Sequence, residues 1–158
     1  MLYEKHLSRE EALYRQFQQC LASLNRAWSI LSELESQPLS GALAAAAVQM
    51  ALIEYAKPFR ESATGEHKRH SLGLPLASED DHLLHRYLLE LRDLALAHSA
   101  TTWTGTGHYL GQNGEAAAAA IPIVELPELP PLADIKALIE RVLEVFYAQL
   151  PLLQQRLV

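Results

Sequence analysis

Residues 90 to 99 of the chain read Glu90-Leu91-Arg92-Asp93-Leu94-Ala95-Leu96-Ala97-His98-Ser99. Five residues within and before this stretch follow one another at steps of three or four, which would place them on one face of a helix: Leu84, Leu88, Leu91, Ala95 and His98. This spacing predicts an α-helix with one apolar face, edged by Arg92. Burying an arginine or a histidine without a partner is costly, so both need a hydrogen-bonding neighbour or a ligand. A structural role in the last helical turn, where a cation favours the negative end of the helix dipole, is one interpretation of both.

Helices are also predicted on both sides of this stretch. A capping box, Ser8-Arg9-Glu10-Glu11, predicts the start of a first helix that ends before Pro38. A second helix is expected from near Ser40-Gly41 to about Arg60, with at least a kink at Pro58. It is apolar on nearly all sides, which indicates a helix buried in the middle of a bundle.

The central helix is expected to begin after Ser78, which suits the N-cap position. A last helix is expected from Pro130-Pro131, and Pro151 is expected to kink or end it. Between the central and last helices, Asn113-Gly114 predicts a hairpin turn with strands near 104–110 and 116–124. A short helix in the alanine run is the alternative. The sequence therefore predicts an all-α, four- to five-helix up-down bundle with a small hairpin or irregular insertion before the last helix.

Composition limits the class of protein. The chain has 158 residues, nearly half of them apolar, which suits a single domain over residues 1–158. Its net charge of −6 argues against a protein that coats long nucleic acid, but it allows a local basic groove. The single Cys20 cannot form an intrachain disulfide, which favours a reducing cytoplasm, and it falls on an apolar helix face as a small buried residue would. No signal peptide is evident, and the longest uncharged helical run, residues 38–53, is too short to span a membrane.

The segment from Arg92 to His98 resembles the signature of the HEPN superfamily, in which an arginine and a polar residue precede an apolar run and a histidine. The flanking Leu-Arg-Asp and Ala-His-Ser are similar to the form found in one bacterial HEPN-like group, as is the upstream Ile53-Glu54-Tyr55-Ala56-Lys57-Pro58-Phe59. The resemblance covers residues 40–150. It implies a small helical domain that acts as a homodimer, and in many members a metal-independent endoribonuclease, here a toxin or defence component. A nucleotidyltransferase-like antitoxin is the partner that it implies.

The resemblance also implies roles for individual residues. His98 would move protons to and from the reacting oxygens of RNA, Arg92 would stabilise charge on the phosphorus, and Asp93 would orient one of them. Neither a metal nor another cofactor is expected. Single-stranded RNA or tRNA would be the substrate, and its contacts would come from five polar or basic residues: Lys57, Arg60, Lys68, Arg69 and Ser99. Lys68 and Arg69 lie in a predicted connector over residues 62–77, whose tip is either solvated or in contact with phosphate.

Two alternatives belong to other functional classes. A non-catalytic HEPN-like dimer could bind a protein partner or a nucleotide, which the acidic composition favours. A metal-binding bundle could use a Glu-x-x-His pattern on the central helix, with Glu54 as a further carboxylate. Its candidate ligands are Glu54, Glu79, His82 and His85. For Glu54 itself, a structural ion pair is preferred over a catalytic acid.

Overall fold

The computed structural model describes residues 8–37, 39–60, 74, 76–97 and 128–157. These residues form four α-helices and one turn of 3₁₀-helix, and they contain no strand. The elements are α1 (Arg9–Ser36), α2 (Gly41–Ala56), η1 (Lys57–Phe59), α3 (Glu79–Ala97) and α4 (Leu132–Gln155). The predicted all-α class is confirmed. The hairpin predicted near Asn113-Gly114 lies outside the described residues.

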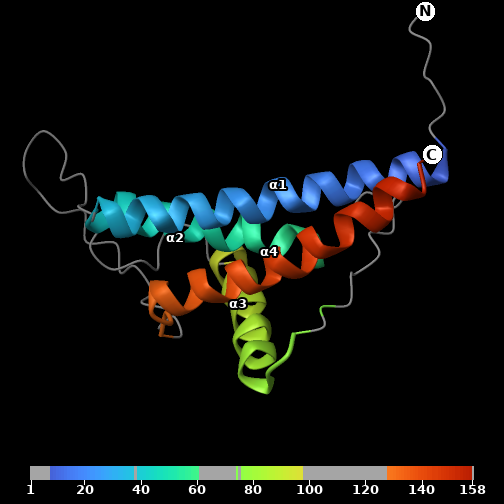
Figure 1. The fold of residues 1–158 in the computed structure, drawn as a ribbon. Coiled ribbons are helices and arrows are strands. Elements are labelled where there is room, and N and C mark those ends of the chain that lie inside the picture. The colour runs from blue at the N-terminus through green and yellow to red at the C-terminus, as the bar shows by residue number, and fades with distance from the viewer. Residues whose placement is uncertain (1–7, 38, 61–73, 75, 98–127, 158) are drawn as a thin grey trace, which may run out of the picture.

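The four helices are not all aligned. Helices α2 and α4 each follow the direction of α1, whereas α3 runs steeply across them (Figure 1). Helix α1 packs on both α2 and α4, and α3 packs mainly on α2, with a smaller contact to α4. The C-terminal half of α3, where the predicted motif lies, is therefore positioned chiefly by α2 and by the turn that follows it.

The helix starts follow from local chemistry. The Ser8 backbone N–H donates to the Glu11 carboxylate at 2.8 Å, and the Glu11 N–H donates to the Ser8 hydroxyl at 3.2 Å. This reciprocal pair satisfies two amides that the first helical turn leaves without partners, and it confirms the predicted capping box. Ser78 accepts from the Asp81 N–H at 3.0 Å, as its predicted N-cap role requires.

Two prolines affect the helices differently. Pro58 lies in η1, so the second predicted helix is α-helical only to Ala56 and tightens into a 3₁₀ turn before Arg60. A proline has no N–H to continue the α-helical ladder, which explains the change. By contrast, α4 continues through Pro151 to Gln155, so this proline does not end the helix.

The core lies where α1, α2 and α4 meet and where α3 crosses them. Its fully enclosed side chains include Leu24, Leu88, Ile139 and Val142, each with no exposed surface. Each such aliphatic side chain contributes about 1.5–3 kcal/mol by leaving water. Cys20 is buried among these residues, as predicted.

Helix α2 is less enclosed than its sequence predicts. Its inner residues, among them Leu52, are buried, but Leu43 is 70% exposed and Met50 is 48% exposed. The expectation of a helix buried in the middle of a bundle is wrong for the described residues, because α2 packs mainly on α1 and α3 and leaves its outer side uncovered by them. None of the helices in the described ranges combines the length and the apolar character needed to cross a membrane.

Candidate functional site

The predicted motif residues Arg92 and Asp93 lie near the C-terminal end of α3. The Arg92 Nη1 atom donates to Asp93 Oδ1 at 3.0 Å, so the two adjacent side chains form an ion pair. The resemblance implies that Asp93 orients Arg92 or His98, and this role stays a prediction beside the observed contact with Arg92.

Arg60 joins this pair from the other side. It directly follows η1, and its Nη2 atom donates to Asp93 Oδ2 at 2.5 Å and to the Leu89 carbonyl at 3.4 Å. The 3₁₀ turn at Pro58 ends the preceding helix, and Arg60 is extended where the chain leaves η1 toward α3. Arg60 and Arg92 thus share one carboxylate, although 32 positions separate them in the sequence.

The side chains of Arg60, Arg92 and Asp93 form a cluster with a net positive charge. Two guanidinium groups and one carboxylate give this cluster one net positive charge, on a chain whose net charge is −6. The Nε atoms of Arg60 and Arg92 are buried without a hydrogen-bond acceptor among the described residues. The side chains themselves are partly exposed, at 39% for Arg60 and 26% for Arg92, so a ligand can reach them. A planar guanidinium presents paired donors that match the oxygens of a phosphate or carboxylate.

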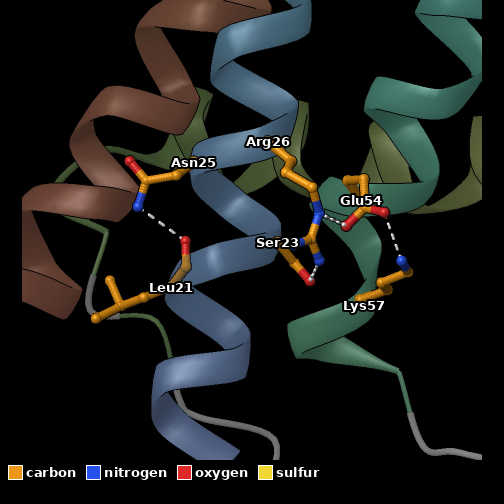
Figure 2. Close-up of polar contacts among 6 residues, drawn as sticks. All are labelled: Leu21, Ser23, Asn25, Arg26, Glu54 and Lys57. Carbon is orange, nitrogen blue, oxygen red and sulfur yellow. Dashed lines mark hydrogen bonds and ion pairs between the residues drawn. The ribbon is translucent and has the colours of Figure 1, made fainter.

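Lys57 is not part of this cluster. Its ammonium group lies 2.5 Å from Glu54 Oε1, and Arg26 from α1 donates to the other carboxylate oxygen at 3.1 Å (Figure 2). Arg26 also donates to the Ser23 hydroxyl at 3.2 Å. The predicted structural ion pair at Glu54 is confirmed, and it links α1 to the end of α2.

The two cations also determine the ionisation of Glu54. Burial alone would raise the pKa of this carboxyl, but the hydrogen bonds from Lys57 and Arg26, with the charges of both, lower it below its ordinary value. Glu54 is therefore held as a carboxylate at neutral pH, which does not suit a proton donor.

The remaining predicted residues lie beyond the described ranges. They are His98 and Ser99, which follow α3 in the sequence, and Lys68 and Arg69, which belong to the connector before it. Of the predicted catalytic and RNA-binding residues that are described, Arg60, Arg92 and Asp93 come together and Lys57 lies apart.

A second polar pair near the cluster was not predicted. The Tyr55 hydroxyl on α2 and His85 Nδ1 on α3 lie 2.7 Å apart. The Phe59 ring packs edge-on against the His85 ring, with centroids 4.7 Å apart. The sequence contains a partial signal, because Tyr55 and Phe59 both lie in the segment that resembles the HEPN-like group, whereas the spacing of His85 predicts only a metal ligand.

The four candidate metal ligands do not assemble. Glu54 is bound by Arg26 and Lys57, His82 Nε2 lies 3.1 Å from the Leu76 carbonyl, and His85 pairs with Tyr55. Glu79 lies 4.0 Å from Arg86 on the solvent-exposed side of α3. Across the part of the chain that the structure describes, no group of three or more histidine, cysteine or carboxylate side chains is arranged to hold a metal ion.

Comparison with known proteins adds no relative, since no family model, curated protein or solved structure matches this chain.

Proposed function

We propose that this chain is a metal-independent endoribonuclease of the HEPN type that acts as a homodimer. The observation that supports it is the pair of arginines, Arg60 and Arg92, that share the Asp93 carboxylate and retain one net positive charge. Such a cluster suits the phosphodiester of RNA, because charge-assisted bonds from guanidinium groups to phosphate oxygens are strong and directional. In the sequence, His98 follows α3 directly and is the proposed acid and base.

The proposed reaction is an internal transfer at phosphorus. His98 takes the proton of the ribose 2′-hydroxyl, and the 2′-oxygen forms a bond to phosphorus while the bond to the 5′-oxygen breaks. A second imidazole returns a proton to the leaving oxygen. Arg60 and Arg92 bind the non-bridging oxygens and stabilise the extra negative charge of the five-coordinate phosphorus. The products are a 2′,3′-cyclic phosphate and a 5′-hydroxyl.

The dimer supplies the second imidazole. On an ideal helix, positions 92 and 98 are separated by about 120° of rotation, so the two side chains of one copy do not converge on one atom. Two copies that meet at a two-fold axis can direct two imidazoles and two sets of arginines to a single phosphate. The charged cluster therefore belongs at, or beside, the proposed interface.

A second candidate function rests on the same cluster. The two arginines can bind the phosphate of a nucleotide without any proton transfer, which would make the protein a non-catalytic nucleotide-binding dimer. Binding of phosphate without cleavage of RNA distinguishes this function from the first.

The test is cleavage of single-stranded RNA and tRNA by the folded full-length protein in EDTA. We expect 2′,3′-cyclic phosphate ends, and a loss of rate of at least about a hundredfold in both His98→Ala and Arg92→Gln. Arg86→Gln is the matched control, because Arg86 is an exposed α3 arginine outside the cluster, and it should cleave as the wild type does. Absence of cleavage by a folded dimer, or full activity of His98→Ala, would refute the proposal.

Cell growth gives a second readout. An active ribonuclease expressed alone should slow growth, and Arg92→Ala should relieve that effect. A nucleotidyltransferase-like antitoxin is the partner that we propose to neutralise it. Unchanged toxicity in the arginine variant would mean that the toxic effect does not come from this site.

A further inference from the structure

His85, the partner of Tyr55, lies on α3 close to the α3 residues of the arginine cluster, Arg92 and Asp93. His85, Leu89 and Asp93 follow one another at single-turn steps. Arg60 donates to the Leu89 carbonyl and to the Asp93 carboxylate, so its guanidinium lies over the turn between Leu89 and Asp93, one turn beyond His85. Arg92 lies two turns from His85, on the same face. The histidine and the two arginines therefore border one continuous surface.

Tyr55 fixes the orientation of the imidazole. Only 1% of the Tyr55 surface is exposed, and burial, with the Asp81 carboxylate as a further cause, raises the pKa of its phenol above the ordinary value. The phenol therefore keeps its proton at neutral pH, and its oxygen lies 2.7 Å from His85 Nδ1. Among the described residues no other acceptor contacts this buried hydroxyl, so we assign the O–H as the donor and Nδ1 as the acceptor. With Nδ1 as acceptor, the neutral ring carries its hydrogen on Nε2.

The surroundings of His85 keep it neutral. Burial is the main cause that lowers the pKa of His85, and electrostatic interactions with His82 and Arg60 lower it further. Phe59, which directly precedes Arg60, packs against the His85 ring with centroids 4.7 Å apart, and this contact brings the chain at Arg60 to the side of the histidine. A neutral imidazole adds a hydrogen-bond donor to the arginine cluster without adding a positive charge that would repel the guanidinium groups.

His82 and His85 each use one ring nitrogen within the described part of the fold. His82 Nε2 lies 3.1 Å from the Leu76 carbonyl, and His85 Nδ1 lies 2.7 Å from the Tyr55 hydroxyl. No described residue forms a hydrogen bond with the Nε2 atom of His85. Because the His85 side chain is only half-buried, this nitrogen can serve as a donor to a ligand.

We infer that His85 is a third anion-binding group of the arginine site, and that its Nε2–H donates to an oxygen of the phosphate bound by Arg60 and Arg92. The ligand class is a phosphate ester, whose tetrahedral oxygens can accept from both guanidiniums and from the imidazole at once. This inference rests on the proposed function in taking the cluster as a phosphate site, but it does not require that RNA be cleaved. Tyr55 acts through His85 and is a positioning residue.

The test is a titration of the full-length protein, labelled with nitrogen-15 in histidine and arginine, with inorganic phosphate. We expect a saturable shift of the His85 Nε2 resonance in the NMR spectrum, together with the Nε–H signals of Arg60 and Arg92. The His82 resonances should stay fixed, since its Nε2 is occupied by Leu76. Arg92→Gln should weaken the apparent phosphate affinity roughly tenfold, and Arg86→Gln should leave it unchanged.

Two variants of His85 separate binding from folding. The amide of an asparagine can reach the position of Nδ1 and keep the contact with Tyr55, but it provides no donor at the position of Nε2, whereas a glutamine can provide one. His85→Asn should therefore weaken phosphate binding about threefold to tenfold with little loss of stability, and His85→Gln should recover part of the affinity. Tyr55→Phe should leave the arginine signals responsive but change the nitrogen shifts of His85 to those of a mixed tautomer.

The outcomes distinguish this inference from the proposed nuclease. Phosphate binding that shifts the arginine signals and leaves His85 Nε2 unmoved would overturn the inference and leave the proposed function intact. A phosphate response at His85 with no cleavage of RNA would support the inference and refute the nuclease. Absence of any saturable phosphate response would overturn the inference outright.

Discussion

The Glu54 carboxylate is buried between α1 and α2 and owes its charge to Arg26 and Lys57. Removing one member of a buried ion pair leaves the other charges without compensation, which costs more than the pair itself contributes. Both cations here are partly exposed, at 56% for Arg26 and 41% for Lys57, so water moderates that cost.

We expect Glu54→Gln to lower the free energy of unfolding by about 1–2 kcal/mol at neutral pH, below the about 3–5 kcal/mol typical of fully buried pairs. Because the folded-state pKa of Glu54 is lowered, its contribution is present above the unfolded value of 4.5 and is lost as the pH falls through the folded value. Urea unfolding should therefore show a difference between wild type and variant at pH 7 that shrinks as the pH is lowered below 4.5.

The control for this experiment is Glu90→Gln, at an exposed position on α3. It should change stability by less than about 0.5 kcal/mol at either pH. A Glu54→Gln difference that does not depend on pH would mean that packing, and not the carboxylate charge, accounts for the loss.

At the scale of residues, the sequence predicted the local part of the candidate site. Arg92 and Asp93 are neighbours in the chain, so their pairing follows from one helix. The contact between Arg60 and Asp93 could not be predicted, because it depends on the direction of the chain after the 3₁₀ turn at Pro58 and on the tilt of α3. The Tyr55–His85 contact joins two helices 30 positions apart and needs the same tertiary information.

At the scale of elements, α3 is attached by a few specific contacts. Leu88 and Leu91 bury its apolar side, and Arg141 from α4 donates two hydrogen bonds to Asp81, at 2.8 and 2.6 Å. Asp81 is 8% exposed and lies in the first turn of α3, so this bidentate pair fixes the N-terminal end of the helix that carries the site.

We expect Asp81→Asn to destabilise the protein by about 1–2 kcal/mol, since it removes the charge from a bidentate pair that is only partly buried on the Arg141 side. Hydrogen exchange should accelerate more at the amides of α3 than at those of α1. Glu79→Gln, which alters a side chain 78% exposed in the same turn, is the matched control and should have little effect. Equal acceleration in all four helices would indicate that α3 does not open separately.

The boundaries of these elements were largely readable from the sequence. Ser8 and Ser78 cap the helices that they were predicted to start, because an N-cap depends on residues within one turn. The change to η1 at Pro58 also follows from local chemistry. The steep crossing of α3 in Figure 1 depends on side-chain packing between helices, for which periodicity carries no information.

In the molecule as a whole, α2 has one side that is buried against the core and one side that is exposed to solvent. Leu52 and Leu43 are the same residue type on the same helix, with exposures of 2% and 70%. We expect Leu52→Ala to cost about 2–5 kcal/mol and Leu43→Ala less than about 0.5 kcal/mol, measured by urea unfolding of dilute protein. Similar losses for the two variants would show that something covers Leu43 in solution.

The open side of α2 contains no charged residue, since none occurs between positions 38 and 53. Salt therefore has nothing to screen there, and sulfate or phosphate salts strengthen the tendency of apolar groups to leave water. Salt has the opposite effect at the arginine cluster, where its ions screen the guanidinium charges and its anions compete with an anionic ligand for the site. Ionic strength therefore changes binding at the two surfaces in opposite directions. A dilute buffer favours binding of anions to the arginines, and a concentrated buffer favours apolar contacts to the open side of α2.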